Sequence, residues 1–448
     1  MRLMMSVSGV RGVVGETMTP ALAAELGCAF GTYLGGGKVV IGRDSRPSGP
    51  MVQQAVVSGL LATGCEVISL GIASTPATAL MVRRHGAQGG IVITASHNPI
   101  IWNGIKFLTN EGLAPPPDQA RRLFDIHGRK AFMLADVDRM GAPQSDPSAA
   151  TTHVEAVLAL VGPAGTASGR LRIVLDSING AGGAEGKRLL EQLGCEVVHV
   201  NAEPTGRFTH APEPLAENLT QLCEVVRDKQ AAAGFAQDPD GDRLAIVDEM
   251  GDCIGEEYTL SLAAKYMFDA HPGPTAANLS TSRMIDDLAA DAGGPCRVYR
   301  SAVGEANVVA AMKEHGCRFG GEGNGGVIDL RVGPVRDSLV AMALTLQLMA
   351  TAGKSISQLV SEIPSYVMIK RKFECSPERV RQVLDAVGTK YASENVNDVD
   401  GVRVDFADGW VHVRGSNTEP VIRIIAEAET ADRAEGLIAA VRELAEGI

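Results

Sequence analysis

Leu171-Arg-Ile-Val-Leu-Asp176 and Gly194-Cys-Glu-Val-Val-His-Val200 are two short apolar runs, separated by a Gly-rich turn and a stretch with a helical pattern. The order of strand, helix and returning strand is typical of a parallel α/β layer. The same order occurs where Lys38-Val-Val-Ile-Gly42 leads to Gly64-Cys-Glu-Val-Ile-Ser-Leu70, and more weakly from 275 to 299. We therefore predict three similar α/β units.

The segment from about Pro364 onward has a different pattern. A helix from Ala431 to Glu446 follows three apolar runs that predict antiparallel strands, and Asp408-Gly409 is a hairpin turn signal between the first two runs. The three runs are Val402-Arg-Val-Asp-Phe406, Gly409-Trp-Val-His-Val413 and Val421-Ile-Arg-Ile-Ile-Ala426. We predict an α/β fold with four domains: three similar mixed α/β domains at 1–148, 149–251 and 252–364, and a smaller C-terminal α+β domain at 365–448.

The composition of the chain disfavours some classes of binding partner. The 448 residues carry 53 acidic and 41 basic side chains, a formal charge of −12, which disfavours binding to nucleic acid or to an anionic membrane. The cysteines show neither a Cys-x-x-Cys pair nor metal-ligand spacing, which favours reduced thiols over a disulfide framework. The apolar runs at 17–37 and 339–352 are interpreted as core helices. We expect a cytoplasmic protein that binds no nucleic acid and no membrane.

Each of the three similar units carries a polar, Gly-rich cluster at or beside a predicted strand. The clusters are Thr94-Ala-Ser-His-Asn-Pro99, Asp238-Pro-Asp-Gly-Asp-Arg243 and Gly320-Gly-Glu-Gly-Asn-Gly-Gly326. Loops at strand ends are where α/β folds place their functional sites. We therefore predict one central cleft that the clusters share.

Ser96 lies in a tight turn, where Pro99 cannot continue a strand. An ordinary turn serine is one interpretation. A hydrolase pair with His97 is disfavoured, because adjacent residues rarely face each other and no Gly-x-Ser-x-Gly motif is present. A serine can instead carry a phosphoryl group if a cation neutralises the phosphate and a base handles the proton. Lys106 is a candidate for that proton transfer.

Asp238, Asp240 and Asp242 recur at a spacing of two, so an extended or turning loop points three carboxylates to one side. Hard oxygen ligands of this kind suit Mg²⁺. A calcium loop of EF-hand type is disfavoured, because Arg243 takes the place that requires glycine. A purely structural turn is the other alternative, although three neighbouring acids repel one another without a cation.

Two further stretches offer groups for an anionic, hydroxyl-bearing ligand. In the third cluster, Glu322 and Asn324 can accept from and donate to sugar hydroxyls, although a flexible turn is the alternative. Arg414-Gly-Ser-Asn-Thr-Glu-Pro420, followed by Arg423, has the parts of a phosphate clamp: two guanidinium groups, of Arg414 and Arg423, and two hydroxyls, of Ser416 and Thr418. Arg11, among glycines near the start of the chain, is a further candidate for contact with phosphate.

These four motifs, in this order, resemble those of the α-D-phosphohexomutase superfamily, and the resemblance covers the whole chain. Thr-Ala-Ser-His-Asn-Pro resembles the phosphoserine loop of that family, and Asp-Pro-Asp-Gly-Asp-Arg resembles its magnesium loop. Gly-Glu-Gly-Asn-Gly-Gly resembles its sugar-binding loop, and Arg-Gly-Ser-Asn-Thr-Glu-Pro its phosphate-binding loop. The resemblance implies four domains around a central cleft.

The resemblance also implies a role for each site residue. Ser96 would carry the phosphoryl group and would bind Mg²⁺ together with Asp238, Asp240 and Asp242. Arg11 and Lys106 would assist proton transfer and stabilise charge, with His97 and Arg243 close by. Glu322 and Asn324 would hold the sugar hydroxyls. The phosphate that does not react would be held by Arg414, Ser416, Asn417, Thr418 and Arg423.

The implied reaction is a phosphoryl exchange within one small-molecule sugar phosphate. Phospho-Ser96 would give its phosphoryl group to a free hydroxyl, and the resulting sugar 1,6-bisphosphate, which also serves as activator, would turn around and return its other phosphoryl group. Gly-Glu-Gly-Asn-Gly-Gly, with Gly326 where related branches often carry histidine, and the opening Ser-Val-Ser-Gly-Val-Arg-Gly resemble the phosphoglucosamine mutase branch. Phosphomannomutase/phosphoglucomutase is the alternative. The sequence leaves the oligomeric state open, with a homodimer as one option.

Overall fold

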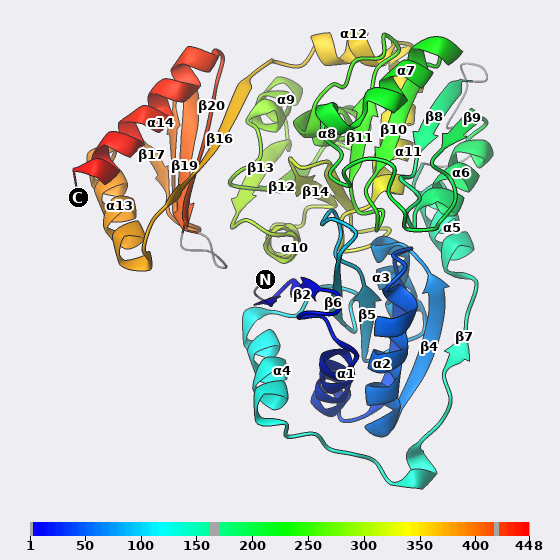
Figure 1. Ribbon diagram of the computed structural model, residues 1–448. Helices are drawn as coiled ribbons and strands as arrows, with labels where there is room; N and C mark the ends of the chain where they lie inside the picture. Colours follow the sequence, from blue (N-terminus) through cyan, green and yellow to red (C-terminus); the bar gives the residue numbers. More distant parts are fainter. Residues whose placement is uncertain (1–2, 162–170, 416–420, 448) are drawn as a thin grey trace. The chain divides into compact units, whose positions relative to one another are not determined.

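The structure is a computed structural model, and it describes residues 3–161, 171–415 and 421–447. The described chain forms two compact units. The first comprises residues 1–266 and 324–360, and the second comprises residues 267–323 and 361–448. Figure 1 labels the helices and strands of both.

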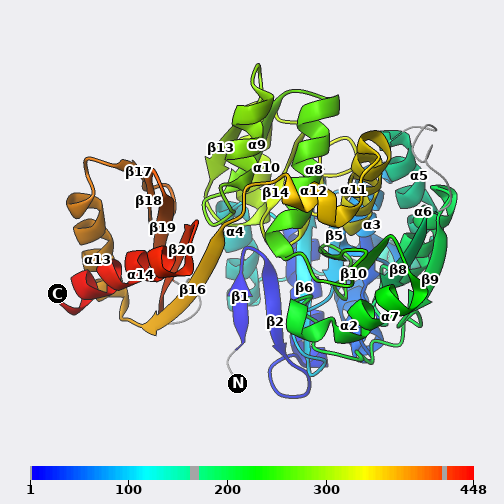
Figure 2. The ribbon, with the colours of Figure 1, turned by 90° about the horizontal axis from the view of Figure 1, so that it is seen from above.

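The first unit contains a mixed seven-stranded sheet. Its strands, in spatial order, are β1 (Met4–Ser6), β2 (Gly9–Val13), β6 (Trp102–Thr109), β5 (Gly89–Ile93), β3 (Gly37–Arg43), β4 (Cys65–Ile72) and β7 (Gln144–Ser145). β3 runs parallel to β4 and β5, whereas β1 and β2 form the antiparallel hairpin that Figure 2 shows at the N-terminal end. β6 lies antiparallel to both β2 and β5, so β2, near the start of the chain, and β5 lie on either side of β6 in this sheet.

Helices cover both faces of this sheet. They are α1 (Pro20–Leu34), α2 (Gly49–Ala62), α3 (Thr75–Arg84), α4 (Pro117–Arg129) and α5 (Ala149–Val161), with a 3-10 turn at Val137–Arg139. Consecutive residues of β3 face opposite sides: Val39 and Ile41 pack with α1 and α2, whereas Val40 packs with α3. A side chain at Gly59 would come within 2.2 Å of a carbonyl oxygen of α1, so a glycine is needed where α1 and α2 touch. The prediction of a core helix within 17–37 is confirmed.

A second sheet of the first unit carries the aspartate motif. Its order is β11 (Leu244–Val247), β10 (Ala233–Gln237), β8 (Arg172–Asp176) and β9 (Glu196–Val200), with α6 (Gly183–Gln192), α7 (Thr220–Lys229) and a 3-10 turn at Ala216–Asn218. β8 is parallel to β9 and β10, as the repeat pattern predicts, and β11 returns antiparallel to β10. The turn between β10 and β11 holds Asp238–Arg243.

Four further elements lie in the first unit, in whole or for most of their length, next to the points in the sequence where the chain passes between the two units. They are α8 (Glu256–Ala270), β15 (Gly326–Asp329), α11 (Ser338–Ala352) and α12 (Ile356–Ser361). Every residue of α11 from Ser338 to Met349 is buried, which confirms its interpretation as a core helix. Among the residues that the structure describes, no helix combines the length and the apolar character needed to span a bilayer.

The second unit contains a parallel α/β layer and an antiparallel sheet. In the layer, β12 (Pro274–Asn278) is parallel to β13 (Arg297–Ser301) and to β14 (Phe319–Glu322). Its helices are α9 (Met284–Ala292) and α10 (Glu305–Glu314). The antiparallel sheet has the order β16 (Val367–Glu374), β20 (Val421–Ala428), β19 (Gly409–Gly415), β18 (Val402–Phe406) and β17 (Asn395–Asn397). α13 (Pro377–Lys390) and α14 (Ala431–Glu446) share one core with one face of this sheet (Figure 2).

Three similar α/β layers and a smaller C-terminal domain are the predicted fold class, which the structure confirms. The predicted hairpin at Asp408-Gly409 also forms, but Phe406 pairs directly with Gly409, so the two turn residues are Ala407 and Asp408. Gly409 belongs to β19, where a side chain would come within 2.4 Å of the carbonyl oxygen of Glu427. The glycine is therefore required by a close cross-strand approach rather than by the turn.

Candidate active site

Ser96 lies in the loop that follows β5, in a conformation that few serines adopt. Its φ is +50°, in the left-handed region, and its side chain is 2% exposed. Its hydroxyl donates to Oδ2 of Asp238 over 3.1 Å and lies 3.3 Å from Nδ1 of His97. The structure therefore brings together the serine and aspartate motifs, which lie more than a hundred residues apart in the sequence.

The side chain of Arg46 anchors the backbone of the loop that contains Ser96, here called the serine loop. Its fully buried guanidinium donates to the carbonyl oxygens of Ser96 and Asn98, each over 2.7 Å, and to those of Pro99 and Trp102. Its Nε pairs with Asp44 at 3.0 Å. The side chain of Arg46 thus provides hydrogen-bond donors for the buried carbonyl groups of this loop. A strained backbone conformation such as that of Ser96 persists only where surrounding contacts hold it in place.

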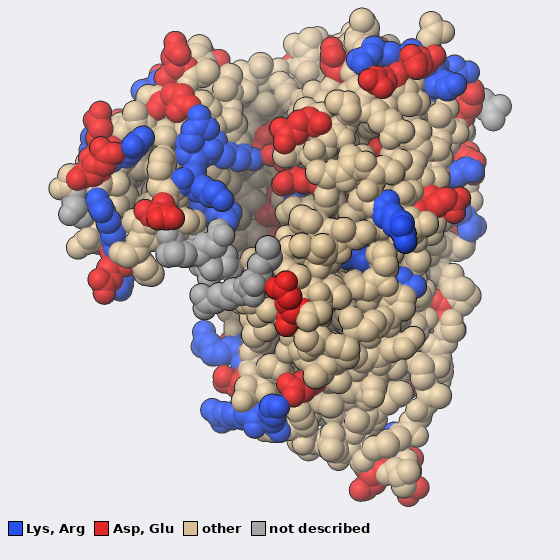
Figure 3. Space-filling model, viewed as in Figure 1, with Lys and Arg blue, Asp and Glu red and all other residues tan. Residues whose placement is uncertain are grey.

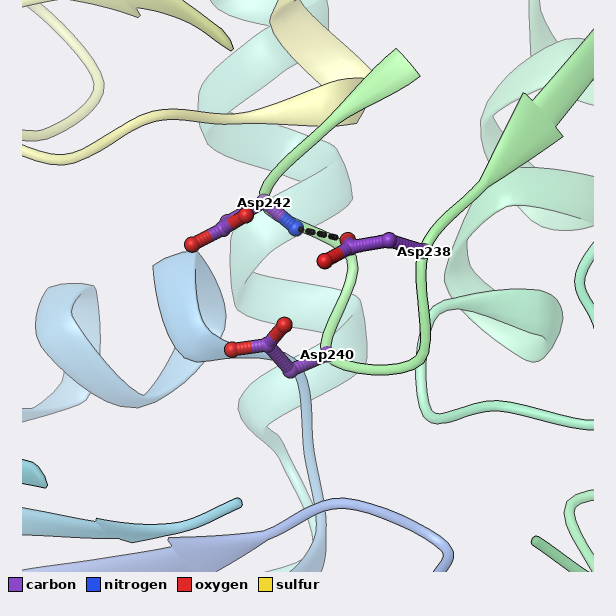
Figure 4. Close-up of side chains that lie close together, drawn as sticks. All are labelled: Asp238, Asp240 and Asp242. Carbon is purple, nitrogen blue, oxygen red and sulfur yellow. Dashed lines mark hydrogen bonds between the residues drawn. The ribbon is translucent and has the colours of Figure 1, made fainter. Parts of the chain in front are cut away.

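The three aspartates form one buried cluster (Figure 4), in which each residue can offer an oxygen within 4.8 Å of the others. Asp238 Oδ1 accepts from the backbone N–H groups of Asp242, over 3.0 Å, and Arg243. Asp240 Oδ2 accepts from Thr75 Oγ1 and Lys106 Nζ, each over 2.6 Å. The protein therefore fixes one oxygen of each of these carboxylates.

The remaining oxygens fit a cation. Among the described residues, Oδ1 of Asp240 and Oδ1 of Asp242 are buried and have no hydrogen-bond partner, and Oδ2 of Asp238 faces Ser96. Burial, followed by repulsion from Asp240 and Asp242, raises the pKa of Asp238 well above its ordinary value. Buried carboxylate oxygens without partners are costly, and hard oxygen donors are the ligands of Mg²⁺. The residues present therefore suit a magnesium ion.

Lys106, on β6, is the nearest protein cation to this cluster. Its Nζ lies 2.6 Å from Asp240 Oδ2 and 3.4 Å from Asp242 Oδ2. Burial alone would lower the pKa of Lys106, but Asp240 and then Asp242 raise it above its usual value. The same contact keeps the pKa of Asp240 below its usual value, although burial opposes this. Lys106 thus serves as a partly buried, charged donor in this arrangement.

His97 and Arg243, from the serine and aspartate motifs, and Arg11, from the start of the chain, lie around this cluster. Arg11, on β2, donates to Asn98 Oδ1 over 2.9 Å, and Arg243 Nε lies 3.9 Å from Asp242 Oδ1. Burial and then the charges of Arg243 and Arg11 lower the pKa of His97 to about 3. Positive side chains therefore surround the three carboxylates, which was not expected from their spacing alone.

Sequence reasoning missed three contributors to this site. Thr75 binds Asp240 through both its hydroxyl and its N–H group, Arg46 holds the serine loop, and Arg336 pairs with Asp242 Oδ2 at 2.7 Å. The only local signal for Thr75 is its place at the start of α3. Arg336 precedes the helix cap Asp337, and nothing in the local sequence indicates its distant partner.

The sugar-loop motif divides between the two units. Asn324 belongs to the first unit, where the next residue, Gly325, accepts a 3.0 Å backbone hydrogen bond from Leu244, beside the aspartate loop. Glu322 belongs to the second unit, where its Oε1 accepts from Asn278 Nδ2 over 2.8 Å and from the N–H of Gly304 over 3.1 Å. The carboxylate of Glu322 is thus held in place by its own layer.

The predicted phosphate clamp lies in the second unit. Arg414 stands directly opposite Arg423 on β20, which stands opposite Lys372 on β16. Directly paired residues point to the same face of a sheet, so the three cations form a row. Figure 3 shows lysine and arginine side chains gathered over β16 and β20. Arg414 Nη1 pairs with Asp400 Oδ2 at 3.2 Å. Ser416, Asn417 and Thr418 lie outside the described residues.

Comparison with protein families gives four successive matches. They are the three alpha/beta/alpha domains of phosphoglucomutase/phosphomannomutase, at residues 2–132, 151–251 and 256–366, and its C-terminal domain at residues 367–444. The matches follow the chain in the order of the three α/β layers and the antiparallel sheet.

Individual proteins match nearly the whole chain. A protein of Methanopyrus kandleri named "Probable phosphoglucosamine mutase" is 41% identical, over 96% of this chain and 95% of its own. A Thermococcus kodakarensis protein named phosphoglucomutase/phosphomannomutase is 38% identical over 95% and 94%. A crystal structure of a phosphoglucomutase/phosphomannomutase family protein from Burkholderia thailandensis superposes with a TM-score of 0.86, at 29% identity over 99% and 98% of the two chains.

Proposed function

Because this chain belongs to the phosphoglucomutase/phosphomannomutase family, whose members are intramolecular phosphotransferases, we propose that it interconverts glucosamine 6-phosphate and glucosamine 1-phosphate. Ser96 carries the phosphoryl group, and a glucosamine 1,6-bisphosphate is the intermediate and activator. The observation that carries this proposal is the 3.1 Å contact between Ser96 Oγ and Asp238 Oδ2, inside a buried cluster of three carboxylates.

The chain's own residues account for the placement of the reacting groups. Asp240 and Asp242 would hold Mg²⁺ through their Oδ1 atoms, which have no hydrogen-bond partner among the described residues, and Asp238 would hold it through Oδ2, which faces Ser96. A bound Mg²⁺ would neutralise negative charge on the phosphate of Ser96. Lys106 adds a fixed positive charge 2.6 Å from Asp240, and Arg11 adds another beside the serine loop. Catalysis of phosphoryl transfer rests mainly on such positioning and electrostatic stabilisation.

Each half of the cycle exchanges one bond for another. The phosphorus–oxygen bond to Ser96 breaks as the oxygen of the free sugar hydroxyl forms a new bond to the same phosphorus, and the proton of that hydroxyl passes, on balance, to Ser96 Oγ. The bisphosphate then turns around, and Ser96 Oγ forms a bond to the other phosphorus as its bond to the sugar oxygen breaks, while the proton of Ser96 passes to the released sugar oxygen. Glu322 and Asn324 hold the sugar hydroxyls, and Arg414 and Arg423 hold the phosphate that does not react.

The choice of glucosamine rests on the Gly-Glu-Gly-Asn-Gly-Gly motif and on seven relatives that carry the name "Probable phosphoglucosamine mutase". A second candidate, interconversion of mannose or glucose phosphates, is favoured by the Thermococcus kodakarensis relative that is named phosphoglucomutase/phosphomannomutase. The test is to incubate the enzyme with Mg²⁺, the matching 1,6-bisphosphate and each hexose 6-phosphate in turn, and to follow phosphorus NMR signals. Turnover of glucosamine 6-phosphate at least about tenfold above the others is the expected result.

The Ser96→Ala variant tests the carrier itself. Loss of a covalent nucleophile should lower turnover at least about a thousandfold without unfolding the chain. Intact-mass measurement should show one phosphate on the wild type after treatment with the bisphosphate and none on the variant. An active Ser96→Ala variant would contradict the carrier role, and release of inorganic phosphate in place of isomerisation would identify a phosphatase instead.

A further inference from the structure

The backbone around Arg336 is fixed independently of the arginine side chain. The next residue, Asp337, caps α11 by accepting from the N–H groups of Leu339 and Val340. Ser338 donates through its hydroxyl, over 2.7 Å, and through its N–H to the carbonyl oxygen of Gly241, in the centre of the aspartate loop. The start of α11 and the aspartate loop are therefore one connected structure, and residue 336 lies beside it.

From this position the guanidinium of Arg336 reaches one oxygen of a proposed metal ligand. Its Nη2 lies 2.7 Å from Oδ2 of Asp242, and the two side chains are only 13% and 1% exposed. Oδ1 of Asp242 has no hydrogen-bond partner among the described residues. Arg336 therefore takes one oxygen of the carboxylate and leaves the other for a cation, much as Thr75 and Lys106 do for Asp240.

The stem of Arg336 passes through space that only a glycine leaves open. A Cβ atom at Gly326 would lie 2.1 Å from Cδ and 2.8 Å from Cγ of Arg336, well inside van der Waals contact. The φ of Gly326 lies outside the left-handed region, so backbone conformation does not explain the glycine. The last glycine of the predicted sugar-binding motif thus makes room for an arginine of the protein.

We propose that Arg336 is a positioning residue that holds Oδ2 of Asp242 and so orients Oδ1 for binding the metal, and that Gly326 is required because it admits Arg336. This inference rests on the proposed function, since it assigns a task within the same site. Residues that hydrogen-bond a metal-ligating carboxylate without contacting the metal themselves typically contribute about 10- to 100-fold to metal affinity or activity. Arg336 is expected to act on metal binding and on kcat rather than on the KM for the sugar phosphate.

A purely structural ion pair is the rival explanation. In that case removal of Arg336 would lower stability, but Asp242 would bind a cation as well as before, or more tightly because a competing positive charge is gone. Metal affinity therefore separates the two explanations, and it can be measured without turnover.

The experiment titrates the full-length protein with Mn²⁺, which takes the same oxygen ligands as Mg²⁺, and reads free Mn²⁺ by electron paramagnetic resonance. Arg336→Ala should weaken Mn²⁺ binding at least about tenfold, and Arg336→Lys should recover part of the loss. Gly326→Ala should weaken binding similarly, because the new methyl group displaces the arginine stem. Gly128→Ala is the matched control, since a Cβ at this position on α4 meets nothing within 4 Å.

The double variant tests whether Gly326 acts through Arg336. Once the arginine is truncated, the added methyl group no longer meets Cγ and Cδ of Arg336. The other close contact, Asn324 Oδ1 at 2.9 Å, is the end of a side chain that can turn away. Arg336→Ala with Gly326→Ala should therefore bind Mn²⁺ no more weakly than Arg336→Ala alone. Additive losses would overturn the pairing, and unchanged or tighter Mn²⁺ binding by Arg336→Ala would overturn the positioning role. If Arg336→Ala fails to fold, Gly326→Ala and Arg336→Lys still decide between the explanations. A wild type that neither binds Mn²⁺ nor isomerises sugar phosphates would instead contradict the proposed function.

Discussion

The carbonyl oxygen of Ser96 accepts a 2.7 Å hydrogen bond from Nη2 of Arg46, a residue that contributes no atom to the aspartate cluster. The same nitrogen donates to the carbonyl oxygen of Asn98, so one guanidinium spans the left-handed turn at Ser96. Arg46 is itself fixed by Asp44, whose carboxylate also accepts from Thr94 over 2.7 Å. The position of the serine hydroxyl therefore depends on a buried ion pair beneath it.

Arg46→Lys should keep the charge that pairs with Asp44 but lose the fork that binds four carbonyl oxygens. We expect a folded protein whose kcat falls at least about tenfold, because a small displacement of a reacting group is costly. Arg46→Ala should in addition lose about 3 to 5 kcal/mol of stability, since it leaves Asp44 buried without its cation. Turnover and thermal unfolding measure the two effects. Arg84→Ala, at an exposed position on α3, is the control, and equal turnover of Arg46→Lys and wild type would contradict this account.

The aspartate cluster should make the reaction depend on metal. We expect chelation to abolish turnover and Mg²⁺ to restore it better than Ca²⁺, whose larger and looser coordination shell misplaces phosphoryl oxygens. Asp240→Asn should weaken metal binding but lower the melting temperature only slightly, because the contacts of Oδ2 with Thr75 and Lys106 are only partly lost. Turnover at different free metal concentrations and calorimetric titration with Mg²⁺ test these statements. Full activity in excess chelator would show that the three aspartates have another task.

His153, on α5, carries a pH-dependent part of the stability of the first unit. The buried ring contacts Asp337 Oδ2 at 2.6 Å and Glu185 Oε2 at 3.1 Å. Burial alone would lower the pKa of His153, but Asp337 and then Glu185 raise it to about 10. A raised pKa favours the folded state while the ring is protonated. This contribution is complete below the ordinary pKa of about 6.5 and is lost as the pH rises to about 10.

His153→Gln removes this proton-binding group. The wild type should be more stable than the variant at pH 7, and the difference should narrow steadily at pH 8 and 9, by up to about 1.4 kcal/mol per pH unit. Thermal unfolding of both proteins at the three pH values measures the difference. A constant gap between the two melting temperatures would show that His153 is not the group that binds the proton.

Local motifs singled out Ser96 and the three aspartates as candidates, because each motif is a short turn at the end of a strand, and the structure places these residues together. An apolar run likewise predicted α11, and the closing helix α14 begins and ends at the predicted residues. Such features depend on neighbours within a few residues, so they can be read from sequence.

The supporting residues could not be predicted in this way, because their partners are distant in sequence. Arg336 meets Asp242 across 94 residues, and Arg46 meets Ser96 across 50. Lys106 was predicted to assist proton transfer, but only the tertiary structure shows that two aspartates keep its charge in a buried site. The electrostatic environment of the three carboxylates therefore follows from the packing of several elements, not from the spacing of the aspartates.

The phosphate that does not react should be held by the row of cations on the C-terminal sheet. Arg414 and Arg423 are paired across neighbouring strands, and Asp400 holds Arg414 through Oδ2, which also accepts from the N–H of Val303 over 3.0 Å. Arg414 is therefore already oriented in the absence of a ligand. Such preorganisation lowers the cost of binding a phosphate.

Arg414→Ala should raise the KM for the sugar phosphate at least about tenfold, because a charge-assisted contact to phosphate is worth a few kcal/mol. It should also increase escape of the bisphosphate, which must turn around and be held again before the cycle closes. Ser96 should still accept a phosphoryl group from excess bisphosphate, because the aspartate site is unchanged. Quenching turnover and counting free bisphosphate per product formed measures the leakage. Arg433→Ala, on α14 beside the exposed Asp408, removes an arginine from the same domain and should change neither quantity. Wild-type KM and wild-type leakage in Arg414→Ala would show that the phosphate is held elsewhere.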